Sequence, residues 1–356
     1  MSLRIEILPY RLHFKQPAGT SRGVYTAHDV WYVVATDTCT GVQGVGECAP
    51  LLDLSCDYSA DYAVVLRRLC DEVCRTSAID YELFRPYPSM LFGLETAFRQ
   101  LERQSWLLWS SPLTSGEQGI PINGLVWMGS FDEMLRRTDE KLQLGFHCVK
   151  IKIGAIDFEK EIALIEHLRS KYDASRIQLR LDANGAFALS DALRKLERLS
   201  AFDVHSIEQP IRAGQWTEMA RLCRQSPIPI ALDEELIGVA QPNEKQRLLD
   251  TIRPQYIVLK PSLHGGISGA EEWISLARER NTGYWITSAL ESNIGLNAIA
   301  QWTATLKPQM PQGLGTGALY VNNIDLPLRI TGDKLFVDAR NYPSVEQVIE
   351  TVKTIS

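Results

Sequence analysis

The chain has 356 residues, of which 45% are hydrophobic and 22% are charged. This composition is that of a folded globular protein with a sizeable core, and it excludes a largely disordered chain. The net charge of −6 and the lack of a basic stripe argue against a protein that binds nucleic acid.

Cysteine usage and the first residues bear on the cellular compartment. The seven cysteines are an odd number in a large chain, which does not fit a disulfide scaffold, so we expect free thiols. The N-terminus has no basic head followed by an apolar stretch and a cleavage site, and no apolar run is long enough to span a bilayer. We therefore expect a cytoplasmic protein without a membrane partner.

Strands followed by helices are predicted for residues 1–115, which is an α+β pattern. Alternation of apolar and polar residues predicts strands at Arg4–Phe14, Val30–Thr36 and Val42–Glu47. Helical periodicity predicts helices at Tyr58–Cys74 and Pro88–Gln104.

A different pattern begins near Ile120, where short apolar runs alternate with amphipathic helices. The predicted strands are Ile122–Val126, Cys148–Ile153, Ile177–Asp182, His205–Glu208, Ile230–Asp233, Tyr256–Lys260, Tyr284–Ser288 and Gln312–Gly315. The predicted helices between them include Asp157–Lys171, Leu189–Leu199, Trp216–Gln225 and Ala270–Arg280. This alternation indicates an α/β protein with a (β/α)₈-type barrel. A doubly wound sheet is the alternative, but no glycine-rich phosphate loop follows the first strand.

The alternation stops after Thr316. Two short strands, Leu326–Ile330 and Leu335–Val337, and a final helix, Ser344–Ile355, are predicted for the tail. We expect this tail to return to the N-terminal domain.

Charged side chains mark the C-terminal ends of five consecutive predicted strands. They are Lys150, Lys152, Asp182, Glu208, Asp233 and Lys260. Successive strand ends are about 25 to 30 residues apart, which is the length of one βα unit, so each residue occupies an equivalent place on its strand. In a closed barrel these places converge on one mouth. A single charged residue there is usually a cap or a surface ion pair, but a run of five strand ends favours a functional site.

Converging carboxylates call for a cation. Asp182, Glu208 and Asp233 would repel one another, and a hard divalent cation would relieve that repulsion. Oxygen-only ligands favour Mg²⁺, we expect Mn²⁺ to be able to substitute, and the lack of Cys or His disfavours zinc. Lys150 and Lys152 share one face of a strand, where like charge and the nearby metal should lower a lysine pKa toward a value useful for a base.

These motifs resemble those of the enolase superfamily, and most closely its muconate-lactonizing subgroup, over nearly the whole chain. Gly46–Leu51 resembles the family's G-E-x-x-P-L stretch, and Lys150–Lys152 resembles its K-x-K on the second barrel strand. The three carboxylates resemble its metal ligands in order, and Lys260 its lysine on the sixth strand. The resemblance implies a modified TIM barrel, (β/α)₇β, at 116–319. It also implies an α+β capping domain formed by residues 1–115 and completed by about 320–356.

The shared chemistry of that superfamily is abstraction of a proton next to a carboxylate, with the metal stabilising the resulting enediolate. The resemblance implies that Lys152 is the acid/base and Lys150 its neighbour, while Lys260 serves the opposite face. Asn184 and Gln209 are candidates for orienting metal-bound water or ligands from behind. Asn184 has a competing role as a turn residue.

Candidate substrate contacts lie at the ends of the last two predicted barrel strands. Ser288 and Glu291 end the seventh, where the mandelate-racemase subgroup would have a histidine. Gly313, Gly315 and Thr316 end the eighth, where small residues let backbone N–H groups approach a carboxylate, although a tight turn is the plain alternative.

An early loop, Gly19–Gly23, resembles the family's mobile cap loop, and its two glycines suit a hinge. Arg22 in this loop is a candidate partner for a substrate carboxylate, with a solvated surface arginine as the alternative.

Within the subgroup the sequence most resembles dehydratases of menaquinone synthesis. These catalyse syn-dehydration of a cyclohexadiene carboxylate that carries a succinyl tail, so a small-molecule carboxylate is the expected partner. Racemisation of N-acylamino acids, which would need both Lys152 and Lys260 as acid/bases, and muconate cycloisomerisation are alternatives. Dipeptide epimerisation is disfavoured because strand eight lacks the Asp-x-Asp of those enzymes. A binding protein that lost activity is the non-enzyme alternative.

Overall fold

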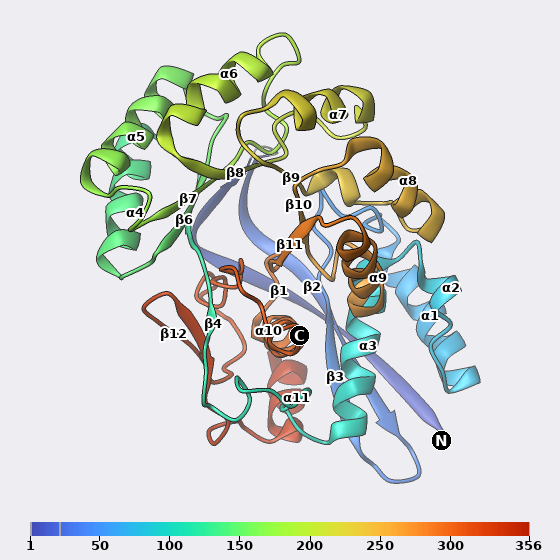
Figure 1. Cartoon of the computed structure of the whole chain (residues 1–356). Coiled ribbons are helices and arrows are strands. Elements are labelled where there is room, and N and C mark those ends of the chain that lie inside the picture. The colour runs from blue at the N-terminus through green and yellow to red at the C-terminus, as the bar shows by residue number, and fades with distance from the viewer. Residues whose placement is uncertain (1, 21–22, 356) are drawn as a thin grey trace.

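A three-stranded antiparallel sheet and the helices packed on it form the N-terminal part of the computed structural model, which describes residues 2–20 and 23–355 (Figure 1). The strands are β1 (Leu3–Thr20), β2 (Gly23–Asp37) and β3 (Gln43–Cys48), in the order β1-β2-β3. The helices that follow are α1 (Tyr62–Thr76), α2 (Tyr81–Phe84) and α3 (Pro88–Arg103). The predicted α+β pattern of this region is therefore confirmed.

The predicted loop at Gly19–Gly23 is wrong for Gly19, Thr20 and Gly23, which lie in β1 and β2. The pairing of β1 with β2 is irregular between His13 and Ala18 and then resumes, so that Gly19 pairs with Val24 and Thr20 pairs with Gly23. Arg22 lies outside the described residues.

Seven parallel strands form the barrel wall, in the order β11-β10-β9-β8-β7-β6-β5. They are β5 (Gly124–Val126), β6 (Cys148–Lys152), β7 (Gln178–Asp182), β8 (Val204–Glu208), β9 (Ile230–Leu232), β10 (Tyr256–Leu259) and β11 (Gly283–Ile286). The connecting helical segments are α4 (Phe131–Gln143), α5 (Phe158–Lys171), α6 (Ala192–Leu199), η1 (Ser200–Phe202), α7 (Trp216–Gln225), η2 (Glu234–Leu236), α8 (Pro242–Ile252), α9 (Gly266–Glu279) and α10 (Asn293–Thr305). Figure 1 shows α4 to α8 arranged around the outside of the strands.

The predicted eighth strand, Gln312–Gly315, is reduced to isolated bridges. Gln312 bridges Ile122 and Gly313 bridges Thr287, both in parallel orientation. The short segment therefore lies between the first and last strands of the wall and joins them. This is the predicted modified TIM barrel, closed by two bridges in place of a regular strand.

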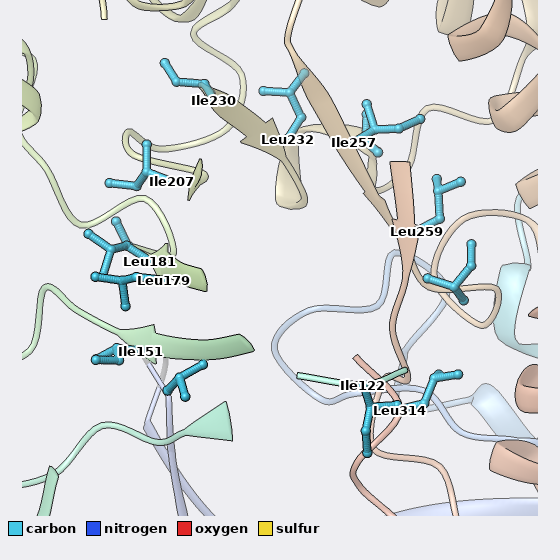
Figure 2. Packing of buried hydrophobic residues seen from close by; sticks show 14 of the residues in the cluster. Ile122, Ile151, Leu179, Leu181, Ile207, Ile230, Leu232, Ile257, Leu259 and Leu314 are labelled. Carbon is cyan, nitrogen blue, oxygen red and sulfur yellow. The ribbon is translucent and has the colours of Figure 1, made fainter. Parts of the chain in front are cut away.

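Alternation along each barrel strand separates the apolar core from the charged interior. Large apolar residues from successive strands form one buried cluster with the surrounding helices, as Figure 2 shows for Ile151, Leu181 and Ile207. Their sequence neighbours Lys150 and Asp182 point to the other side of the wall. A period of two thus places the charged residues inside the barrel while apolar burial stabilises the strands.

The tail returns to the N-terminal sheet, as expected. Strands β12 (Leu328–Thr331) and β13 (Lys334–Val337) pair with each other, and β13 also pairs with β4 (Ile120–Pro121). The final helix α11 (Val345–Ile355) buries its apolar face in a cluster with residues of β1 and β2. Because β4 precedes the barrel and pairs with the tail, the exact domain limits stay a prediction.

Two further expectations concern thiols and membranes. All seven cysteines are free, as predicted. Across the described ranges, no helix combines the length and the apolar character needed to cross a membrane.

Candidate active site

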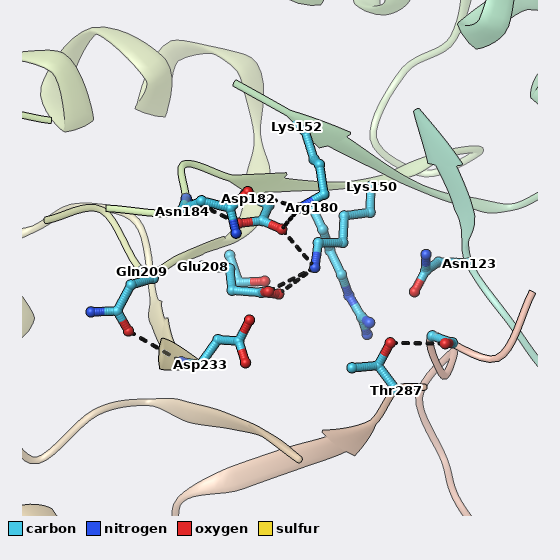
Figure 3. A network of polar contacts seen from close by, with 12 residues as sticks. Asn123, Lys150, Lys152, Arg180, Asp182, Asn184, Glu208, Gln209, Asp233 and Thr287 are labelled. Atoms are coloured by element: carbon cyan, nitrogen blue, oxygen red, sulfur yellow. Dashed lines mark hydrogen bonds and ion pairs between the residues drawn. The ribbon is translucent and has the colours of Figure 1, made fainter. Parts of the chain in front are cut away.

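The charged strand ends come together at one mouth of the barrel (Figure 3). Lys152 is in register with Asp182, and Asp182 is in register with Glu208, so parallel pairing aligns the three strand ends directly. Five of the six predicted residues line a cavity of about 300 Å³: Lys150, Lys152, Asp182, Glu208 and Lys260. Asp233 lies behind this lining and is 1% exposed.

Lys150 bridges two of the carboxylates. Its Nζ donates to Glu208 Oε1 and Oε2 at 2.7 and 2.6 Å, and it lies 3.0 Å from Asp182 Oδ2. Lys152 Nζ donates to the same Asp182 oxygen at 3.1 Å. The two lysines, which the two-residue spacing placed on one strand face, therefore also share one aspartate.

Asp233 is held from two sides. Lys260 Nζ donates to its Oδ2 at 2.5 Å, while the side-chain oxygen of Gln209 accepts from the backbone N–H groups of Asp233 and Glu235, each at 3.2 Å. Asp233 Oδ1 has no hydrogen-bond partner in the part of the chain that the structure describes. Gln209 itself is fully buried and lies outside the cavity lining, so it acts on the turn that carries Asp233.

Asn184 reaches the cavity and contacts the predicted acid/base directly. Its Oδ1 accepts from Lys152 Nζ at 2.7 Å, and its Nδ2 donates to Glu234 Oε1 at 3.0 Å. The backbone of Asn184 has a φ of +43°, in the left-handed region that asparagine tolerates better than most residues. The turn role and the functional role that the sequence left as alternatives therefore occur together.

Burial and crowding of charge shift the pKa values of these groups. Burial and repulsion from Asp182 raise the pKa of Glu208 to about 8, despite the nearby lysines. Burial alone would raise the pKa of Asp182, but the ammonium groups of Lys150 and Lys152 outweigh it and hold that pKa below its usual value. Burial would lower the pKa of Lys150 and Lys260, but the surrounding carboxylates outweigh it, and both values are raised.

The raised pKa of Lys150 is the opposite of the lowered lysine pKa that the sequence predicted. The reason is that the protein's own charges at the mouth include several carboxylates close to the lysine, and these favour its charged form. A lowered lysine pKa at this site therefore depends on a cation that neutralises the carboxylates.

The donor set suits a hard divalent cation. Asp182, Glu208 and Asp233 offer only oxygen ligands and are at most 2% exposed, and one oxygen of Asp233 lacks a partner in the described chain. In this structure the carboxylates form ion pairs with lysines, and the described residues contain no group of three Asp, Glu, His or Cys side chains already arranged around one metal position. The chemistry of these residues thus fits such a cation. A bound cation would interact with the same carboxylates that now pair with the lysines.

The candidate substrate contacts divide into two groups. Ser288, Gly313, Gly315 and Thr316 line the cavity, and the hydroxyls of Ser288 and Thr316 lie 2.6 Å apart. Glu291 is fully buried outside the lining, where its carboxylate accepts from Ser262 Oγ and, at 2.7 Å, from the backbone N–H of Ala289. The structure therefore brings all of these residues except Glu291 to the cavity.

Several cavity residues were not predicted from the sequence. They include Gln16, Tyr25, Leu51, Leu54, Asn123, Trp127, Glu234, Thr287, Leu290 and Leu319. Glu234 directly follows Asp233, so its position alone could have suggested it, whereas Asn123 is the second residue of the predicted strand Ile122–Val126 and lay away from the predicted strand ends. The capping-region residues carried no such signal, because their place over the barrel depends on how the two parts pack.

Comparisons with known proteins agree with this geometry. Residues 133–334, more than half of the chain, match the family model described as Enolase C-terminal domain-like. An o-succinylbenzoate synthase from Desulfotalea psychrophila is 46% identical over 93% of this chain and 98% of that protein.

Two solved structures share the fold. The crystal structure of MenC from Desulfotalea psychrophila has a TM-score of 0.81 and 41% identity, covering 95% of this chain and 100% of that one. A dipeptide epimerase from Cytophaga hutchinsonii, complexed with Mg and the dipeptide D-Ala-L-Val, has a TM-score of 0.79, with 95% and 94% covered. At 21% identity, the second similarity shows the fold alone.

The family match covers the barrel segment that carries all six charged strand-end residues, and the similar proteins extend over the capping region as well. The resemblance of the motifs to one superfamily is thereby confirmed. This chain belongs to the enolase superfamily.

Proposed function

We propose that this chain is an o-succinylbenzoate synthase. The reaction is syn-dehydration of 2-succinyl-6-hydroxy-2,4-cyclohexadiene-1-carboxylate to 2-succinylbenzoate in menaquinone synthesis, which makes the enzyme a carbon–oxygen lyase. The observation that carries the proposal is the 46% identity to an o-succinylbenzoate synthase over 93% of the chain. The lysines and carboxylates at the barrel mouth supply the groups that such a reaction needs.

Lys152 is the acid/base in this proposal. Its Nζ lies in the cavity, where Asn184 Oδ1 and Asp182 Oδ2 orient it. It takes the proton from the carbon next to the substrate carboxylate and then returns that proton to the departing hydroxyl, which leaves as water. One C–H bond and one C–O bond break, and the ring becomes aromatic.

Lys150 and Lys260 support the reaction without carrying that proton. Lys150 holds Asp182 and Glu208 in place through its bridging ion pairs. Lys260 enters from β10, three strands away from β7, and places positive charge on another side of the cavity. A positive group held in place near a developing negative charge stabilises the transition state by on the order of 3 kcal/mol.

Asp182, Glu208 and Asp233 would hold Mg²⁺ in this proposal. A cation held there would supply positive charge that stabilises the negative charge developing next to the substrate carboxylate. The related dipeptide epimerase structure contains Mg, which supports the choice of metal. We expect Mn²⁺ to replace Mg²⁺, because it accepts the same oxygen ligands.

The cavity walls suit a ring with a flexible carboxylate tail. Leu54, Trp127 and Leu319 provide an apolar wall, while Ser288 and Thr316 provide hydroxyl groups. Small ligands of this kind are usually bound by apolar walls with a few polar groups. In this proposal Gly313, Gly315 and Thr316 approach the substrate through their backbone, and Arg22 pairs with a substrate carboxylate from the capping region.

Other reactions of the superfamily fit less well. Dipeptide epimerases have an Asp-x-Asp at the end of strand eight, and this chain has Gly313, Leu314 and Gly315 there. Racemisation of N-acylamino acids stays a second candidate, since Lys152 and Lys260 both line the cavity. Muconate cycloisomerisation is a third, because the subgroup shares its lysines and carboxylates.

One assay tests the proposal. Purified protein with Mg²⁺ is offered the cyclohexadiene substrate and an N-succinyl amino acid in parallel reactions. We expect rapid aromatisation of the first and at most slow racemisation of the second. Racemisation without aromatisation would replace the proposal with the racemase.

We further propose a cytoplasmic location and a division into a capping domain, 1–115 with about 320–356, and a barrel domain, 116–319. Free cysteines, two of them exposed, suit a reducing compartment. Cell fractionation would test the cytoplasmic location. Limited proteolysis with mass spectrometry would test the division into two domains.

A further inference from the structure

His28, on β2 of the capping region, lies between two loops that form part of the catalytic cavity. One loop follows β3 and contains Pro50, which directly precedes the cavity residue Leu51. The other loop follows β11 and contains Leu290, which lines the cavity itself. Leu51 and Leu290 belong to one buried apolar cluster, so the two loops share one stretch of the cavity wall.

Both ring nitrogens of His28 face backbone carbonyls. Nδ1 lies 3.0 Å from the carbonyl oxygen of Leu290, and Nε2 lies 3.1 Å from that of Pro50. His28 is 6% exposed, which leaves the ring little access to water. A neutral imidazole has one N–H donor and one lone pair, whereas a charged imidazole has two donors. The neutral ring can therefore donate to only one of the two carbonyls, and only the charged ring can donate to both.

Leu290 has a strained backbone that depends on contacts of this kind. Its φ is +68°, in the left-handed region, which a leucine rarely adopts. Such strained residues persist only where their surroundings hold them, and they cluster at functional sites. The hydroxyl of Tyr320, in the tail, donates to the Leu290 carbonyl at 2.6 Å, and Nδ1 of His28 approaches the same oxygen. Two side chains from outside the barrel thus hold a strained loop of the catalytic cavity.

Burial decides when the ring gains its second proton. It lowers the pKa of His28 below the ordinary value of 6.5. The carbonyls of Leu290 and Pro50, and to a smaller extent the charge of Asp29, raise this pKa again but only in part. At neutral pH the ring is therefore neutral and donates to one carbonyl, and it becomes charged in acidic solution.

Other titratable groups lie around the ring on the elements packed against it. On β1, Arg11 pairs with Asp29. In the tail, the hydroxyl of Tyr320 lies 3.4 Å from Nδ1. Burial, Glu47 at the end of β3 and Glu291 in the loop after β11 raise the pKa of this hydroxyl, so it stays an uncharged donor. Because the pKa of Glu47 is itself about 7, the effect of the ring is isolated by comparing variants at the same pH.

We propose that His28 is a positioning residue that draws the Pro50 and Leu290 loops together around the substrate when its ring is charged. The charged ring donates to both carbonyls and fixes the wall that Leu51 and Leu290 form. The neutral ring releases one carbonyl and lets the wall widen, so a ligand that needs the closed wall binds more tightly to the charged form. The tightening of the loops does not depend on the proposed function, whereas its effect on the substrate rests on it.

The loops are tested by NMR of ring-labelled histidine and by hydrogen exchange over a pH series. We expect both nitrogens of His28 to carry protons at the acid end and only one at neutral pH. Protection of the backbone amides of residues 49–54 and 288–292 should rise as the ring gains its charge. In His28→Gln, whose side chain does not titrate, this pH-dependent part of the protection should be absent. His13→Gln, at an exposed histidine of β1, is the matched control and should behave as the wild type.

A second variant keeps the test independent of how well His28→Gln folds. Tyr320→Phe removes the other donor to the Leu290 carbonyl. The protection of residues 288–292 should then depend more strongly on pH, since the ring of His28 becomes the remaining side-chain donor to that oxygen among the described residues. A ring that gains its charge without changing the protection of either loop would overturn the proposal, as would a ring that stays neutral throughout the pH range of the folded protein.

Coupling to a ligand is tested by calorimetry with 2-succinylbenzoate, the product of the proposed reaction, in the presence of Mg²⁺. From neutral to acidic pH, the wild type and His13→Gln should gain about five-fold more affinity than His28→Gln. Reciprocally, bound 2-succinylbenzoate should raise the proton affinity of His28 by the same factor in the NMR titration. Equal gains in all three proteins would overturn the coupling. Failure of the proposed function would appear as no binding of 2-succinylbenzoate at any pH, and it would leave the NMR and exchange results on the loops standing.

Discussion

Glu47, at the end of β3, accepts hydrogen bonds from Ser292 through both carboxylate oxygens. The backbone N–H of Ser292 donates to Oε1 at 2.7 Å, and its hydroxyl donates to Oε2 at 2.6 Å. The backbone N–H of Gly295 adds a third bond, to Oε2, at 2.8 Å. A fully buried carboxylate from the capping region therefore satisfies the free N–H groups at the start of α10 in the barrel.

The first prediction concerns the pH dependence of this contact. Burial raises the pKa of Glu47 to about 7, despite the three hydrogen bonds, so the folded state holds this proton more tightly than the unfolded state. The stability contributed by Glu47 is thus complete below its unfolded pKa and falls as pH rises toward about 7. Between about pH 5 and about pH 8, the free energy of unfolding should lose on the order of 2 kcal/mol through this group.

Glu47→Gln should remove that part of the pH dependence in urea unfolding experiments. Glu117→Gln, at an exposed position, is the matched control and should keep the wild-type slope. If the free energy of unfolding changed with pH equally in the wild type and in Glu47→Gln, the raised pKa of the buried Glu47 would be contradicted.

The second prediction concerns the metal. Asp182→Asn, Glu208→Gln and Asp233→Asn should each lower kcat by at least about 10³-fold and weaken Mg²⁺ binding in calorimetry, because each removes a charged oxygen ligand. EDTA should abolish turnover, and added Mg²⁺ should restore it. Full turnover in EDTA would refute the metal site.

The third prediction concerns Asn184. Its side chain orients Lys152, and its backbone is left-handed, so Asn184→Gly removes the hydrogen bonds while keeping a backbone that glycine adopts freely. We expect kcat to fall by about 10- to 100-fold with little change in KM or in the free energy of unfolding. Asn281→Gly, at another left-handed asparagine between α9 and β11, should change neither quantity. Equal kcat values for the two variants would show that the side chain of Asn184 does not help to position Lys152 for the reaction.

The fourth prediction separates dehydratase from racemase by proton exchange in D₂O. A one-base enzyme should exchange the α-proton on one face only, and Lys152→Ala should abolish that exchange. Lys260→Ala should keep some one-sided exchange while lowering turnover strongly, by about 10²- to 10³-fold, since a fixed positive charge is lost. Loss of exchange from one enantiomer in each variant, with N-acylamino acids, would instead indicate a racemase.

The fifth prediction concerns Arg22. If Arg22 contacts the substrate in both ground and transition states, Arg22→Ala should mainly raise KM. Arg11→Ala, at an exposed arginine of β1 paired with Asp29, is the control. Unchanged kcat and KM in Arg22→Ala would favour the alternative, in which Arg22 is a solvated surface residue without a substrate contact.

The sequence by itself was sufficient to predict the barrel and the group of charged strand-end residues at its mouth. Strand ends about one βα unit apart, from Lys152 to Lys260, must lie side by side once the strands pair in parallel. The period of two along each strand then decides which face each side chain takes, as it does for Lys150 and Ile151. Both are local properties of the chain, so they can be read before the fold is known.

Only the tertiary structure decided where side chains beyond the strand ends point. Gln209 and Glu291 looked like equivalents of Asn184 and Ser288 in sequence, yet both turn away from the cavity. The backbone of Gln209 adopts a φ of +40°, which follows from how its turn packs and from no local pattern.

The partners of the charged groups were equally beyond the sequence. Lys150 bridges Asp182 and Glu208, and Glu47 reaches across to Ser292, because parts of the chain that are far apart in sequence pack together. The strength of such contacts depends on burial and on the distance between charges, both of which arise only when the capping region and the barrel meet.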